Sequence, residues 1–253
     1  MSVSQEKSIM KRISSFLFTM LASLCFAAIS ASAADAIKPG GVIVFGASGQ
    51  AGSEIIKLLV AKGEAITAFV RPSSDRKRLG DAKVSIVEGD VMMSADVDAA
   101  MMKAKPRVAI NALGRGKDQW GFWAISQINI TAAAKKTGTT ELIYLSSVGV
   151  GDSAMAYTPE ALERTKVVHA ERLIAEENIK ASGLTYVIIR IGGVNWHGVP
   201  STGKSSLTED RSVLGMIQYA DLALLTVDSM NNPKYANKTW ASVDPTVKRP
   251  EGR

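Results

Sequence analysis

The chain has one cysteine and two histidines among its 253 residues. The cysteine, Cys25, lies in an apolar stretch near the N-terminus, so the remainder of the chain can form neither a disulfide nor a cysteine metal site. Neither His169 nor His197 has a second ligand at helical spacing, and such histidines are usually structural or solvated. No metal site is predicted, and the scarcity of thiols suits an oxidising compartment.

Runs of a single charge sign are also missing. The formal net charge is +6, but acidic and basic residues are mixed along the chain without a basic cluster. Proteins that bind nucleic acid usually gather lysine and arginine on one face or in one run. The sequence therefore predicts no nucleic-acid partner.

Only one long hydrophobic run is present, and it lies near the N-terminus. Three cations, Lys7, Lys11 and Arg12, precede an apolar segment over residues 13–29, and Ala31-Ser-Ala33 follows it. This order predicts a secretory signal peptide over residues 1–33, with Met10 as an alternative start. The alternative is an uncleaved anchor, but the run is shorter than the roughly 20 residues that a span needs. We expect an exported protein, periplasmic or secreted, with no stable membrane span after cleavage and one domain over residues 34–253.

A glycine-rich turn follows an apolar run at residues 42–45 and precedes a segment with helical spacing. In a strand–turn–helix unit of this kind, glycines permit the tight turn, the approach of a pyrophosphate and the packing of helix on strand. The helix N-terminus then offers N–H groups and a partial positive charge to phosphates. We predict a nucleotide site at Gly46, Ser48, Gly49, Gln50, Ala51 and Gly52.

A second strand is predicted over residues 65–70 and ends at Arg71. Folds that prefer NAD usually place an acidic residue here, where it binds the ribose 2′-hydroxyl. Arg71 and the serines and cations after it suit a 2′-phosphate instead, so NADP is the predicted cofactor and NAD is less favoured. Arg76 and Lys77 also fit an ordinary solvated helix face, so only Arg71 is assigned to the phosphate.

Two more predicted strands end in candidate cofactor residues. The first, over residues 83–90, ends at Asp90, which either accepts a hydrogen bond from the adenine amino group or caps its own turn, with Val91 beside it. The second, over residues 107–114, places Ala112, Leu113 and Gly114 under the nicotinamide side of the cofactor. The aromatic-rich loop over residues 115–123 either lines an apolar substrate pocket or covers the core.

Strands and helices alternate through the rest of the chain. Helices are predicted over residues 124–136, 158–181 and 218–230, and strands over residues 141–147, 184–190 and 238–243, with a loop-rich stretch at 192–216. Thr158-Pro-Glu is typical of an N-cap followed by proline at the first helical position. The alternation predicts a single α/β domain, Rossmann-like, with a doubly wound, mostly parallel sheet.

Six segments carry a family resemblance: Gly46-Ala-Ser-Gly49-Gln-Ala-Gly52, Val70-Arg71, Glu88-Gly-Asp90, Leu145-Ser-Ser147-Val-Gly, Ser182-Gly-Leu-Thr-Tyr-Val-Ile-Ile-Arg190 and Tyr219-Ala-Asp221-Leu-Ala. Together they resemble the atypical short-chain dehydrogenase/reductases, most of all the NAD(P)H-binding branch that is NmrA-like and biliverdin-reductase-B-like. The match covers about residues 40–243. It implies the fold and a nicotinamide cofactor, but it does not specify the reaction.

The catalytic residues depart from that superfamily's pattern. Ordinary members use a tyrosine followed four residues later by a lysine that lowers the tyrosine pKa, and no tyrosine of this chain has a lysine at that distance. The resemblance places Ser146 or Ser147 at the usual serine position. It places Lys166, one residue off the expected spacing, near the nicotinamide ribose, while Ile191 stands where a proline often follows the strand.

Two functions from different classes follow. In the first, the protein is an NADP-dependent reductase of a small, partly apolar carbonyl or conjugated substrate, with protonation by water, His197 or the substrate itself. In the second, it is a non-catalytic nucleotide-binding sensor or assembly factor that acts through a protein partner. The missing tyrosine–lysine pair and the predicted export favour the second reading, whereas the complete cofactor frame favours the first.

Overall fold

A mostly parallel sheet organises the part of the chain that the computed structural model describes, which is residues 40–114, 120–195 and 198–248. The strand order is β3-β2-β1-β4-β5-β6-β10-β8. The strands are β1 (Val42–Phe45), β2 (Ile66–Val70), β3 (Ser85–Glu88), β4 (Val108–Asn111), β5 (Glu141–Ser147), β6 (Thr185–Ile191), β8 (Ser206–Thr208) and β10 (Lys238–Val243). This order confirms the predicted doubly wound Rossmann-like fold.

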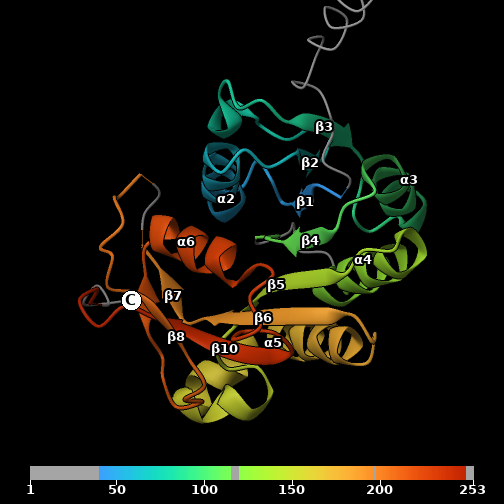
Figure 1. Ribbon diagram of the computed structural model, residues 1–253. Coiled ribbons are helices and arrows are strands. Elements are labelled where there is room, and N and C mark those ends of the chain that lie inside the picture. The colour runs from blue at the N-terminus through green and yellow to red at the C-terminus, as the bar shows by residue number, and fades with distance from the viewer. Residues whose placement is uncertain (1–39, 115–119, 196–197, 249–253) are drawn as a thin grey trace, which may run out of the picture. The chain divides into compact units, whose positions relative to one another are not determined.

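Helices cover both faces of this sheet, as Figure 1 shows. The helices are α2 (Gln50–Ala61), α3 (Ser94–Ala104), α4 (Phe122–Thr137), α5 (Pro159–Lys180) and α6 (Tyr219–Ser229), with short 3₁₀ turns η1 (Lys77–Leu79) and η2 (Gly151–Ala156). Helices α2 and α6 pack together on one face, while α4 packs between α3 and α5 on the other. Each face therefore has its own core.

The strand residues alternate between these two cores, as the two-residue period of a strand requires. In β1, Val42 and Val44 join the cluster beneath α2 and α6, whereas Ile43 and Phe45 join the cluster beneath α3, α4 and α5. All four side chains are buried. Because both faces of the parallel strands are covered, the strands read as continuous apolar runs rather than as alternating ones.

The C-terminal half departs from the prediction in two places. The stretch expected to be loop-rich contains β8, which pairs antiparallel with β10, and a separate parallel pair formed by β7 (Gly193–Val194) and β9 (Met216–Ile217). Helix α4 begins at Phe122, two residues before the expected start, so part of the aromatic loop is helical. By contrast, the Thr158 hydroxyl caps α5 as predicted, accepting from the Ala161 N–H at 3.3 Å.

Some predictions fall outside the described residues. They are the signal peptide over residues 1–33, most of the aromatic loop at 115–119, and His197. Within residues 40–114, 120–195 and 198–248, no helix has the length and apolar character needed to cross a bilayer.

Candidate functional site

The turn between β1 and α2 requires glycine at its first and third glycine positions. Gly46 has a φ of 79°, and a Cβ there would lie 2.7 Å from the Ala112 carbonyl oxygen. A Cβ on Gly52 would lie 2.2 Å from the Gly46 carbonyl oxygen. The Gly49 N–H donates to that same oxygen at 2.9 Å, which closes the turn. The backbone therefore passes too close to itself for any side chain at Gly46 or Gly52.

The N-terminus of α2 is left open by this turn. Gly49 is the N-cap residue, no side chain caps the helix, and its first turn contains no acidic residue. The first N–H groups of a helix have no intrahelical acceptor, and they carry the positive end of the helix dipole. This arrangement suits a phosphate group.

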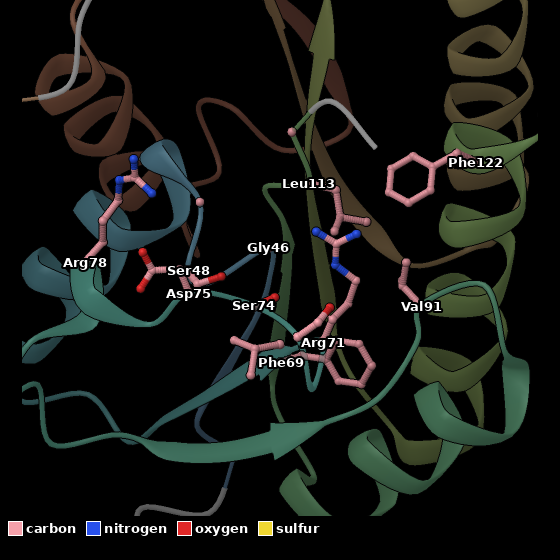
Figure 2. Close-up of a pocket in the computed structure, with 14 residues that line it drawn as sticks. Gly46, Ser48, Phe69, Arg71, Ser74, Asp75, Arg78, Val91, Leu113 and Phe122 are labelled. Carbon is pink, nitrogen blue, oxygen red and sulfur yellow. The ribbon is translucent and has the colours of Figure 1, made fainter. Parts of the chain in front are cut away.

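A cavity of about 310 Å³ adjoins the turn. It is lined by residues from the ends of β1, β2 and β4, the segment from β2 through η1, the loop after β3, and the start of α4: Gly46, Ser48, Gly49, Phe69, Val70, Arg71, Ser73, Ser74, Asp75, Arg78, Val91, Leu113, Gly114 and Phe122. Figure 2 shows these side chains converging from separate strands. The cavity thus lies at the carboxyl edge of the parallel sheet, where such folds bind ligands.

Seven of the predicted cofactor residues line this cavity: Gly46, Ser48, Gly49, Arg71, Val91, Leu113 and Gly114. Five others, Gln50, Ala51, Gly52, Asp90 and Ala112, lie beside it in the chain but are not among the lining residues. For Asp90 the structure shows the capping alternative, because its carboxylate accepts from the Met92 N–H at 2.9 Å.

The β2 side of the cavity is predominantly cationic. Arg71 extends across the cavity toward Leu113, and Arg78 lies toward Ser48 (Figure 2). Among the described residues Arg71 forms no ion pair, whereas Arg76 is paired with Glu88. Asp75 also lines the cavity, and its Oδ1 accepts from the Lys77 N–H at 2.9 Å. Arg78 and Asp75 were not predicted, because nothing in the sequence shows which residues of η1 and its approach turn inward.

A buried amide fixes the β4 side of the cavity. Asn111 Nδ2 donates to Gln127 Oε1 at 2.7 Å, and Asn111 Oδ1 accepts from the Leu113 N–H at 3.1 Å. Gln127 in turn donates to Thr131 at 3.1 Å. Because Asn111 and Gln127 are buried, this chain of hydrogen bonds holds the loop after β4 against α4.

The two candidate serines differ in their surroundings. Ser146 is 2% exposed and donates to Glu176 Oε1 at 2.6 Å, and Glu176 also receives two hydrogen bonds from Arg190. The Ser146 hydroxyl is therefore already committed to a buried network. Ser147, the last residue of β5, is half-buried, and its hydroxyl donates to the adjacent Val148 carbonyl at 3.0 Å. Neither serine is among the residues that line the cavity.

Lys166 does not reach the cavity. Its side chain is 64% exposed and pairs with Glu163 on the solvent side of α5. One turn further along, His169 is buried against the turn after β5, where a Cβ on Gly149 would lie 2.3 Å from its Cε1. Its pKa is lowered, first by burial and then by the nearby charge of Arg172. Lys166 is therefore not part of this cavity, and its place near the nicotinamide ribose stays a prediction.

The start of α4 is capped by a residue from another helix. The Glu171 carboxylate of α5 accepts from the Gly121 N–H at 2.7 Å and the Trp123 N–H at 3.1 Å. The Arg172 guanidinium lies 3.8 Å above the Trp123 ring and donates to the Leu145 carbonyl at 2.9 Å. These contacts hold Phe122, the residue between the two capped amides, at the edge of the cavity.

An open glycine turn, a carboxyl-edge cavity and a doubly wound sheet define the class of Rossmann-like dinucleotide-binding proteins. The sequence model described as NAD(P)H-binding matches residues 46–233, and the chain belongs to that family. This confirms the resemblance to the NAD(P)H-binding branch of the atypical short-chain dehydrogenase/reductases.

Individual relatives agree with this placement. An uncharacterised chloroplast protein of Arabidopsis thaliana is 30% identical over 210 residues, which cover 78% of this chain and 74% of the relative. ChuY, an anaerobilin reductase from Escherichia coli O157:H7, has a similar structure with a TM-score of 0.73, 24% identity, and coverage of 83% of this chain and 99% of ChuY. A short-chain dehydrogenase/reductase from Veillonella parvula, solved with NADP, has a TM-score of 0.65 at 17% identity, covering 82% of this chain and 95% of that one.

Proposed function

We propose that the protein is an NADP-dependent reductase of a small, partly apolar carbonyl or conjugated compound. The observation that carries the proposal is the cavity between the open N-terminus of α2 and the cationic end of β2. In this arrangement the diphosphate lies against residues 46–49, and the adenosine half lies over the ends of β2, β3 and β4. The nicotinamide half then extends toward the carboxyl ends of β5 and β6.

The preference for NADP rests on the charge around the adenosine ribose. Arg71 and Arg78 both line the cavity, and the ordinary acidic residue at the end of β2 is replaced by Arg71 itself. The carboxylate of Asp75 is partly engaged by the Lys77 amide.

Bound NADPH would supply a hydride to the substrate. Of the two serines, we assign to Ser147 the hydrogen bond to a substrate oxygen, since the Ser146 hydroxyl is held by Glu176. The proton comes from water, from the substrate or from His197. The description of ChuY as an anaerobilin reductase supports reduction as the reaction type.

The second candidate is a nucleotide-binding protein without turnover, acting through a protein partner. Two observations favour it: the chain has no tyrosine–lysine pair, and both Ser146 and Lys166 are engaged elsewhere. The two candidates share the cofactor site and differ in chemistry. NADPH oxidation by the purified protein against quinones, enones, aldehydes and flavins separates them, because tight binding without turnover on any substrate supports the second candidate.

Cofactor choice is tested by titrating the protein with NADPH and NADH. We expect NADPH to bind more tightly, and Arg71→Ala to weaken NADPH by roughly tenfold or more, as loss of a charge-assisted hydrogen bond gives. NADH affinity should change much less. Arg76→Ala is the matched control, because Arg76 is already paired with Glu88. Equal affinity for both cofactors in the unmodified protein contradicts the assignment to NADP.

We also propose that the protein is exported, on the strength of its N-terminal sequence. Cell fractionation and determination of the mature N-terminus test this proposal. A mature chain that begins close to Ala34 in the periplasm or the medium supports it, and a cytoplasmic chain that retains Met1 or Met10 contradicts it. Export raises the question of cofactor supply, because nicotinamide cofactors are kept mainly in the cytoplasm.

A further inference from the structure

Phe122 is the aromatic residue of α4 that lines the cavity, and it does so from the first position of the helix. Figure 2 shows its ring directed toward Leu113 and the end of the Arg71 side chain, with Val91 on the same side of the cavity. The phosphate-binding turn lies on the other side, near Ser48. The cavity thus has an apolar end and a polar end.

The apolar end is where the adenine base belongs. In a doubly wound dinucleotide fold the residue at the end of the second strand faces the adenosine ribose, so the base lies just beyond it, over the ends of the neighbouring strands. Here those ends contribute Val91 and Leu113, and α4 adds Phe122. An aromatic ring at such a position can stack on a base.

The position of Phe122 is set by Glu171 rather than by α4 itself. The N-cap of α4 is Gly121 in the left-handed region, with a φ of 78°, and no side chain of its own caps the helix. The Glu171 carboxylate, 8% exposed, instead binds the amides on both sides of Phe122. The Trp123 ring, 5.1 Å from the Phe122 ring and edge-on to it, is pinned beneath Arg172.

We infer that Phe122 forms one wall of the adenine site and that Glu171 is the positioning residue that holds it there. This inference rests on the proposed NADP site and adds the base-recognition element to it. It also explains why a carboxylate from α5 is kept buried at the start of α4, where a serine, threonine or aspartate in the chain itself is the common solution. Helix α5 thereby takes part in cofactor binding without touching the cofactor.

The test measures affinity for 2′,5′-ADP, a fragment that carries the base and both phosphates of the adenosine half, together with NADPH. Phe122→Ala should weaken both ligands by roughly five- to hundredfold, the range that loss of one base–aromatic stack gives. Phe122→Tyr should keep the affinity, which separates loss of the ring from loss of folding. Trp120→Ala is the matched control, because Trp120 is two residues away and 84% exposed.

Glu171→Gln should weaken 2′,5′-ADP by roughly two- to tenfold, because the charge-assisted hydrogen bonds to the two amides are lost or weakened. The decisive measurement is the double variant. If Glu171 acts through Phe122, the Gln substitution has little further effect once Phe122 is alanine, whereas an independent structural role gives additive losses.

Unchanged affinity in Phe122→Ala, or full additivity in the double variant, overturns the inference while leaving the NADP site intact. Failure of the unmodified protein to bind both NADPH and 2′,5′-ADP overturns the proposed function, and the inference with it. Failure of the inference is therefore seen in the variants, whereas failure of the proposed function is seen in the unmodified protein.

Discussion

Replacing Glu176 by alanine should destabilise the protein far more than replacing its neighbour Glu177. Glu176 is fully buried and forms a bidentate pair with Arg190, with Nε–Oε1 at 3.0 Å and Nη2–Oε2 at 2.7 Å, while Ser146 donates to it at 2.6 Å. The alanine leaves the Arg190 charge buried with only Asp152, whose side chain is 61% exposed, as a partner. Breaking a buried pair from one side typically costs about 3–5 kcal/mol.

The assay is thermal and urea unfolding followed by circular dichroism. For a domain of this size, 1 kcal/mol corresponds to roughly 2–4 °C in Tm, so Glu176→Ala should lower Tm by about 6–20 °C. Glu177 is the matched control, because it lies on the same helix and pairs with Lys180 at the surface, with 61% of its side chain exposed. An exposed pair of this kind contributes at most about 1 kcal/mol.

A paired substitution sharpens the test. Glu176→Met combined with Arg190→Met removes both buried charges together, and it should recover most of the stability lost in Glu176→Ala, because desolvation of the pair is no longer required. Equal losses for Glu176→Ala and Glu177→Ala would refute the reasoning. So would a double methionine variant that is no more stable than Glu176→Ala, since the cost would then lie in packing rather than in the unpaired charge.

Three further perturbations follow from the structure. Gly52→Ala should abolish NADPH binding in a titration, because its Cβ would lie 2.2 Å from the Gly46 carbonyl oxygen. Burial lowers the pKa of His169 in the folded protein. The contribution of His169 to stability is therefore complete above its unfolded-state pKa of about 6.5, and it is lost as the pH falls below that value. His169→Gln should flatten the pH dependence of Tm between about pH 7 and 5. Burial raises the pKa of Glu141, whose Oε2 accepts from the Asn231 N–H at 2.8 Å while Oε1 has no hydrogen-bond partner among the described residues. Its stabilising contribution is therefore lost as pH rises through the folded pKa, and Glu141→Gln should raise Tm at pH 8 more than at pH 4.

The features predicted correctly from sequence are those that depend on neighbouring residues. The glycine turn, the apolar strands on either side of it and the Thr158 cap each depend on a few consecutive residues. The mostly parallel sheet was predicted from the alternation of strand and helix, because parallel strands need helical crossovers. Arg71 reached the cavity because the end of β2 is always at the cofactor edge in this fold.

The features that were missed depend on residues far apart in the chain. The early start of α4 depends on Glu171, and no capping residue next to Phe122 in the sequence predicted it. The burial of Ser146 depends on Glu176, which lies 30 residues later in the chain. From the sequence alone, Ser146 and Ser147 were therefore equivalent candidates for the catalytic serine. Lys166 faces solvent because of the rotation of α5 against the sheet, which its weakly periodic sequence does not specify. Strand β8 spans three residues, too few to carry a recognisable alternation.

The cap that α5 supplies to α4 also sets an order of events during folding. Gly121 and Glu171 are 50 residues apart, and closing a loop of that length costs about 3.5 kcal/mol in its length-dependent entropy alone. A growing chain that has not yet produced α5 therefore holds the first turn of α4 only loosely. We expect such a chain to form the phosphate-binding turn early and to complete the cavity only after α5 has docked, so the nucleotide would be captured late, by a nearly finished domain.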